Sequence, residues 1–231
     1  MSYTGYVKMF SSFCEGLKNA SLSRPVQILE IGVDRGQTAL PLLHNLISRD
    51  VDFAFYGVDI RQDETFLNQI DKMDGVVYDR ADKKCNYFYC IANSLDFLPK
   101  IKQDSEGAAF DLILVDGDHN YQTVFAELNH INSLSHKYSL IALDDYSKKY
   151  AREDQFYSDH PGYESLSHKD LDKNSSKQGV MTAVEDFISQ NPQWHITDLE
   201  HEDEVCFLTQ NIFLENDKEN NIFNIIVSED E

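Results

Sequence analysis

The feature that most constrains the fold is a regular alternation of short apolar runs with amphipathic stretches of helical length. The runs are rich in Val, Ile, Phe and Tyr and apolar almost throughout, as is typical of strands buried on both faces. They span residues 26–31, 53–58, 87–92, 110–115 and 138–143, and the amphipathic stretches span 37–48, 64–72, 94–102 and 121–134. This order predicts an α/β fold with a doubly wound, mostly parallel sheet and right-handed crossovers.

The pattern changes after the fifth apolar run. Residues 147–178 are polar and show neither helical nor strand periodicity, which predicts a lid or a disordered loop. A further helix is expected over 179–190, followed by strands over 194–199 and 205–210. We interpret residues 1–231 as a single domain with a helical cap over 1–24, the insertion 147–178 and an acidic tail over 211–231.

Charge and composition exclude several classes of protein. Forty Asp and Glu residues against twenty Lys and Arg give a net charge of −20, which disfavours binding to nucleic-acid phosphates or to an anionic membrane surface. The four cysteines have no CxxC spacing, no apolar run could span a bilayer, and the first residues do not resemble a signal peptide. We therefore expect a cytoplasmic protein with reduced thiols, and the sequence leaves open whether it is a homo-oligomer.

Polar residues follow each of the first five predicted strands, and this is the main functional signal. Ligands of open parallel sheets bind outside the carboxyl ends of the strands. The polar residues at those ends are Glu30, Asp59, Asn93, Ser94, Asp116, Asp118, His119, Asp144 and Asp145.

The first turn carries Gly32 and Gly36 with three residues between them. Glycine allows a close approach of the backbone to a ligand and dihedral angles that other residues avoid. The spacing departs from the dinucleotide pattern GxGxxG, because Val33 and Asp34 fill its centre. Asp59 ends the second strand, where a carboxylate can accept hydrogen bonds from both ribose hydroxyls. A tight turn without a ligand and a solvated Asp59 are the alternatives.

A second constellation follows the fourth and fifth strands, with Asp116, Asp118 and His119 on one and Asp144 and Asp145 on the other. Clustered carboxylates raise one another's pKa and are usually paired with a cation. Oxygen ligands without cysteine favour Mg²⁺, with Mn²⁺ or Ca²⁺ as alternatives. His119 could act as general base for a hydroxyl group. The alternative is that these acidic groups face water or cap helices, with Asp118 as an N-cap.

These residues resemble known motifs. Residues 28–38 and 56–59 resemble the first two motifs of class I S-adenosylmethionine-dependent methyltransferases. The DGDHNY segment ending at Tyr121, together with Asp144-Asp145, is similar to a metal-dependent O-methyltransferase branch that includes macrolide sugar O-methyltransferases and cephalosporin-hydroxylase-like proteins. Residues 179–184 and 191–194 also fit that branch, and the resemblance covers about residues 25–210. It implies a Rossmann-like sheet of seven strands, helices on both faces and an antiparallel C-terminal strand.

The resemblance also implies a function and site residues. The function would be S-adenosylmethionine- and Mg²⁺-dependent transfer of a methyl group to a hydroxyl of a small molecule of sugar or natural-product type. His119 would take the substrate proton. The cofactor-binding residues would be Glu30, Gly32, Gly36, Asp59, Asn93, Ser94 and Asp116, and the metal ligands would be Asp116, Asp144 and Asp145. The family usually has Gly-Gly where this chain has Tyr138-Ser139, so the turn before the fifth strand must differ.

Three other readings compete with this one. A nicotinamide-dependent oxidoreductase would share Asp59 but leaves the cluster of Asp116, Asp144 and Asp145 unexplained. A metal-dependent hydrolase would use that cluster but leaves Gly32, Gly36 and Asp59 unexplained. A non-catalytic binding module on the same fold is the third, against which the intact metal and base positions argue.

Overall fold

The computed structural model describes residues 24–61, 63–77, 85–104, 109–155, 172, 174–197 and 205–210. The expected cap over 1–24, apart from its last residue, lies outside the described residues. The same holds for residues 156–171 and 173 of the insertion and for the acidic tail over 211–231. None of the described helices is long and apolar enough to cross a membrane.

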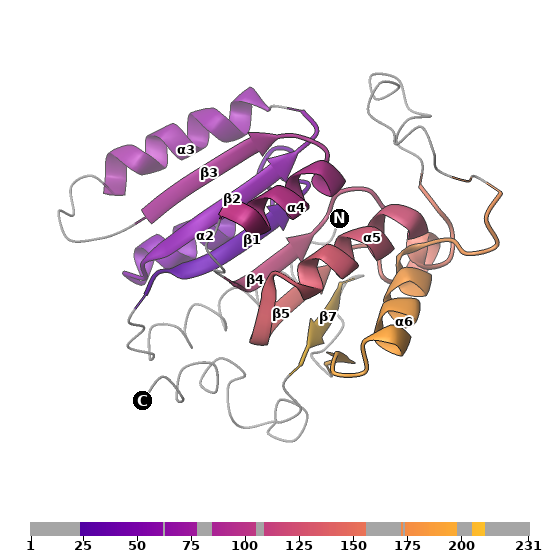
Figure 1. Ribbon diagram of the computed structural model, residues 1–231. Helices are drawn as coiled ribbons and strands as arrows, with labels where there is room; N and C mark the ends of the chain where they lie inside the picture. The colour runs from indigo at the N-terminus through magenta and orange to yellow at the C-terminus, as the bar shows by residue number, and fades with distance from the viewer. Residues whose placement is uncertain are drawn as a thin grey trace.

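A seven-stranded sheet organises the described chain, with strand order β3-β2-β1-β4-β5-β7-β6 (Figure 1). The first five strands pair in parallel, and β7 runs antiparallel to both β5 and β6. The bounds are β1 Val26–Ile31, β2 Phe53–Asp59, β3 Cys85–Ile91, β4 Phe110–Val115, β5 Ser135–Leu143, β6 His195–Ile196 and β7 Cys206–Thr209. The predicted doubly wound α/β fold with an antiparallel C-terminal strand is confirmed.

Helices cover both faces of the sheet (Figure 1). They are α2 Ala39–Ser48, α3 Glu64–Val77, α4 Ser94–Asp104, α5 Tyr121–Asn132 and α6 Val180–Gln190, with a short 3-10 helix η1 at Lys148–Ala151. Residues of α2 and α3 share one apolar cluster with the sheet, and residues of α4, α5 and α6 share the other. Successive β1 residues alternate between them, with Ile28 in the first cluster and Leu29 in the second. This double burial explains why the strands are apolar throughout.

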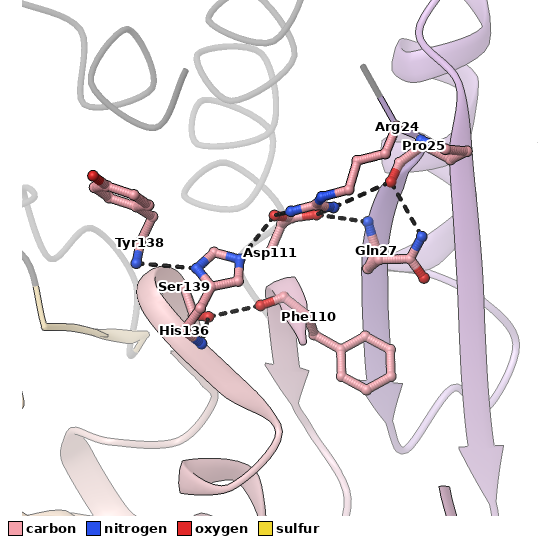
Figure 2. A network of polar contacts seen from close by, with 8 residues as sticks. All are labelled: Arg24, Pro25, Gln27, Phe110, Asp111, His136, Tyr138 and Ser139. Atoms are coloured by element: carbon pink, nitrogen blue, oxygen red, sulfur yellow. Dashed lines mark hydrogen bonds and ion pairs between the residues drawn. The ribbon is translucent and has the colours of Figure 1, made fainter. Parts of the chain in front are cut away.

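The amino ends of three strands are joined by a buried carboxylate (Figure 2). The Asp111 carboxylate on β4 accepts two hydrogen bonds from Arg24, at 2.8 and 2.7 Å, and one from the backbone N–H of Gln27 on β1 at 2.7 Å. Its Oδ1 also lies 3.0 Å from Nε2 of His136 on β5. Burial opposes ionisation, but the hydrogen bonds from His136 and Arg24 outweigh it and lower the pKa of Asp111.

A bulge forms the start of β5, which begins at Ser135 rather than at residue 138 as the apolar pattern indicates. Phe110 pairs with Ser135 whereas Leu112 pairs with Leu140, so residues 136–139 bulge out of register. Ser139 Oγ accepts from the His136 backbone N–H at 2.8 Å and donates to the Phe110 carbonyl at 2.7 Å. Hydrogen bonds of the Ser139 side chain thus shape this turn (Figure 2), at the place where the O-methyltransferase branch that the sequence resembles usually has two glycines.

Candidate active site

The carboxyl ends of the parallel strands bring the predicted site residues to one edge of the sheet. Glu30 ends up 1% exposed, and neither oxygen of its carboxyl group has a hydrogen-bond partner among the described residues. Burial raises its pKa well above the ordinary value, and the charges of Asp116 and Asp59 raise it further. A buried carboxyl group without donors is costly for stability. A perturbed group of this kind at the ligand edge of a parallel sheet is a candidate functional residue.

The two glycines of the first turn have packing partners within the protein. Gly32 has φ +84°, and a Cβ there would lie 2.0 Å from the Asp116 carbonyl oxygen. Gly36 has φ +74°, and a Cβ there would lie 2.3 Å from the Phe66 ring. Any other residue would therefore push apart the ends of β1 and β4 or displace α3. The lack of a side chain at Gly32 and Gly36 therefore allows close packing between neighbouring elements of the fold, in addition to any close approach of a ligand.

Asp59 ties together the loops that follow β1 and β2. Its Oδ2 accepts from the Asp34 backbone N–H at 2.8 Å, and its Oδ1 accepts from the Arg61 backbone N–H at 3.0 Å. The Arg61 guanidinium then reaches Asp34 Oδ1 at 2.8 Å. Each Asp59 oxygen keeps a lone pair, so the carboxylate can still accept ribose hydroxyls. Asp34 and Arg61 were not among the predicted site residues, although both flank predicted ones in the sequence.

The turn after β3 carries Asn93 and Ser94 at the start of α4. Asn93 Oδ1 accepts from the Leu95 backbone N–H at 2.9 Å, which closes the turn, and the Ala92 backbone N–H donates to the Asp59 carbonyl at 2.8 Å. Ser94 Oγ donates to Glu127 Oε1 on α5 at 2.5 Å. Glu127 was not predicted, and its only sequence signal is a charged residue on the apolar face of that helix.

His119 lies between two carboxylates from different strands. Its Nδ1 is 2.5 Å from Asp145 Oδ2, and its Nε2 is 3.5 Å from Asp116 Oδ1. Burial lowers the pKa of His119, but Asp116 and Asp145 outweigh that effect and raise it to about 10. In this arrangement the imidazole is protonated at neutral pH and neutralises part of the acidic cluster.

The carboxylates after β4 and β5 crowd one another. Burial raises the pKa of Asp144 to about 7, and the charges of Asp116 and Asp145 contribute to the shift. Asp145 adopts a left-handed backbone with φ 54°, which directs the chain sharply away from the strand. The donor chemistry of the three carboxylates fits Mg²⁺. Among the described residues, however, no three His, Cys, Asp or Glu side chains are arranged to hold a metal ion. Asp145 Oδ2 contacts His119 Nδ1 instead.

Asp118 points away from this cluster into the start of α5. Its Oδ2 accepts from Asn120 Nδ2 and from Thr123 Oγ1, the latter at 2.8 Å, and burial raises its pKa. The N-cap of α5 is Asn120, whose Oδ1 accepts from the Thr123 backbone N–H at 3.0 Å. The alternative that Asp118 caps this helix is therefore wrong.

The first described part of the insertion packs beside His119. The Tyr150 ring of η1 stands edge-on to the His119 ring at 6.5 Å between centroids, and Gln155 forms an isolated antiparallel bridge with His119. Asp154 Oδ1 accepts from the backbone N–H groups of Tyr121 and Gly179, both at 2.7 Å, which joins the starts of α5 and α6. The polar composition of 147–178 gave no sign of this anchoring.

Comparisons with known proteins bear on the family and the fold. A family model described as a methyltransferase domain matches residues 29–146, just over half of the chain. A search of curated protein sequences found no match. Two solved structures of CalS11 align with this chain, with TM-scores of 0.54 and 0.55 and 12% sequence identity. One is described as a calicheamicin methyltransferase and the other as a TDP-rhamnose 3'-O-methyltransferase. Each alignment covers 88% of this chain and 77% of the CalS11 chain. PaMTH1 of Podospora anserina, solved with SAH, aligns with a TM-score of 0.49 at 15% identity, covering 87% of this chain and 77% of that one.

The chain belongs to the methyltransferase-domain family. It is an S-adenosylmethionine-dependent methyltransferase, as the sequence motifs predicted, and the CalS11 structures share its fold. The matched segment runs from Leu29 in β1 to Tyr146 and so includes the carboxyl ends of all five parallel strands. The oxidoreductase, hydrolase and non-catalytic readings are not favoured.

Proposed function

We propose that the protein transfers a methyl group from S-adenosylmethionine to a hydroxyl group of a small molecule of sugar or natural-product type, with Mg²⁺ at the acidic cluster. The observation that carries this proposal is His119, held between Asp116 and Asp145 at the same edge of the sheet as the ribose candidate Asp59. The fold shared with a TDP-rhamnose 3'-O-methyltransferase supports the choice of acceptor class.

The cofactor occupies the first three strand ends in this proposal. Asp59 accepts the ribose hydroxyls, Glu30 faces the methionine end, and the turn with Asn93 and Ser94 borders the adenine. The buried Glu30 oxygens, which lack donors among the described residues, support a partner of this kind. Gly32, Gly36 and the Asp116 backbone set the spacing between β1 and β4 beside the cofactor.

The acceptor hydroxyl lies beside His119. Its oxygen attacks the sulfonium methyl in line, the carbon–sulfur bond breaks to leave a thioether, and the hydroxyl proton passes to His119. Asp116, Asp144 and Asp145 would hold Mg²⁺, which would supply positive charge that offsets theirs and favours ionisation of a nearby hydroxyl. Positive charge beside Asp116 would also lower the pKa of His119, so that the ring would be able to accept the proton.

Calorimetric titration tests the cofactor first. S-Adenosylhomocysteine should bind the purified protein, and NADH should not. Initial rates of S-adenosylhomocysteine release are then measured with a panel of sugar and natural-product hydroxyl acceptors, with EDTA or with added Mg²⁺. Absence of binding of S-adenosylmethionine and its product at millimolar concentration would sink the proposal, and full turnover in EDTA would remove the metal from it.

A further inference from the structure

Glu127 is a buried acidic residue for which the proposed methyl transfer has no use. It lies on α5 facing α4 and is 0% exposed, on a helix face it shares with Val124, Leu128 and Ile131. Burial raises its pKa to about 8, and the charge of Asp118 contributes, so its carboxyl group is neutral at pH 7. An apolar side chain of similar size would fill this position at lower cost.

The carboxyl group instead makes a polar contact inside the second apolar cluster. Glu127 Oε1 accepts from Ser94 Oγ at 2.5 Å, which joins α5 to the first residue of α4. One turn earlier on α5, Thr123 Oγ1 donates to Asp118 Oδ2 at 2.8 Å. Glu127 Oε2 and Asp118 Oδ1 are both buried without hydrogen-bond partners among the described residues. The two contacts lie one turn apart on α5, and they hold that helix to the turn before His119 and to the turn after β3.

We propose that Glu127 is a positioning residue for the cofactor, which holds Ser94 and the first turn of α4 at a fixed distance from α5. This inference rests on the proposed function, because Ser94 borders the cofactor only there. A hydrogen bond between two buried side chains fixes one relative position of two helices, whereas apolar packing tolerates small slides. Glu127 therefore links the cofactor side of the site to the helix that begins beside His119.

A double-mutant cycle on the whole protein tests the coupling. Glu127→Met removes the acceptor but keeps the length of the side chain, and Ser94→Ala removes the donor. Each should weaken S-adenosylhomocysteine binding by roughly 3- to 10-fold, the effect of one hydrogen bond. The double variant should bind S-adenosylhomocysteine no less tightly than the single variant of lower affinity, because both changes break the same contact. Glu127→Gln keeps an acceptor at this place and should bind within about 3-fold of wild type.

A matched control separates positioning from general loosening of α5. Asn132 lies at the other end of that helix, where its Oδ1 accepts from Trp194 Nε1 at 2.8 Å. Asn132→Leu should lower the melting temperature as Glu127→Met does, but leave the dissociation constant of S-adenosylhomocysteine unchanged.

Specific results of these binding measurements would overturn the inference about Glu127. Additive losses in the cycle, or equal loss of binding in Asn132→Leu, would overturn the inference, as would unchanged binding in Glu127→Met. If Glu127→Met does not fold, the cycle is run with Glu127→Leu, which also removes the acceptor, and the double variant should again show a non-additive loss. An unchanged affinity in Ser94→Ala also overturns the inference. Wild-type protein that binds no S-adenosylhomocysteine contradicts the proposed function instead, so the two failures are distinct.

Discussion

The two ends of one sheet treat buried carboxyl groups in opposite ways. At the amino end Asp111 is 4% exposed and has a lowered pKa, because Arg24, His136 and the Gln27 backbone N–H donate to it. At the carboxyl end Glu30 is buried to a similar extent and has a raised pKa, since the described chain supplies it with no donor. Burial alone therefore does not decide the charge of such a group; the supply of donors does. The carboxyl group at the amino end contributes to stability, and the one at the carboxyl end is costly unless a partner is supplied, as the proposed function requires.

The largest difference between the two ends should appear in a pair of histidine variants. His119→Ala should lower turnover by roughly 10²–10⁴-fold, because the carboxyl end loses its base. His136→Ala at the amino end should lower the melting temperature and leave turnover near wild type. Initial rates and thermal melts of both variants check this, and turnover that survives in His119→Ala would remove it from the role of base.

Asp111→Asn should cost about 2–4 kcal/mol in the free energy of unfolding, because the Arg24 guanidinium loses its charged partner. Glu30→Gln replaces a carboxyl group whose burial raises its pKa and disfavours the charged form, and it should cost less than about 1 kcal/mol. Urea unfolding at pH 7 measures both. Equal losses would contradict the contrast between the two ends of the sheet.

The pH dependence of stability should run in opposite directions for Asp111 and Glu127. The folded pKa of Asp111 is lowered, so its contribution is present above the unfolded pKa of about 3.9 and is lost as the pH falls through the folded value. The folded pKa of Glu127 is raised to about 8 from 4.5, so its contribution is present below 4.5 and is lost as the pH rises through 8.

Urea unfolding between pH 3 and pH 9 measures the two slopes. Asp111→Asn should flatten the acid side of the profile, and Glu127→Gln should flatten the alkaline side. If the free energy of unfolding of Asp111→Asn falls with acid as steeply as that of the wild type, another carboxylate controls acid unfolding.

The smallest expected effect is that of Mg²⁺ on thermal stability. Excess Mg²⁺ should raise the melting temperature of the wild type by a few degrees through mass action, on the order of 1–3 kcal/mol. Asp145→Asn should abolish this shift while keeping the affinity for S-adenosylhomocysteine near wild type, and Asp111→Asn should retain it. Loss of cofactor binding in Asp145→Asn would contradict the division between metal and cofactor residues.

The sequence predicted the parts of this molecule that depend on local pattern. The predicted bounds of β1 and β4 coincide with the observed ones. The polar residues expected at the strand ends include His119 and the two carboxylates beside it, Asp116 and Asp145. It predicted neither the link of Asp111 to Arg24 and His136 nor that of Glu127 to Ser94, because each joins segments far apart in the chain. Of the strand expected over 194–199, His195–Ile196 forms β6, and residues 198–199 lie outside the described residues. The metal ligands, the cytoplasmic location and the single-domain division stay predictions.

The backbone conformation at Asp145 bears on which substitutions this position tolerates. A residue with φ 54° occupies a conformation that glycine adopts without strain, whereas a β-branched residue there would be strained. Asp145→Gly would therefore remove the proposed metal ligand and the partner of His119 with little conformational penalty. The cost to folding would come instead from His119, which is buried and would lose one of its two carboxylate partners.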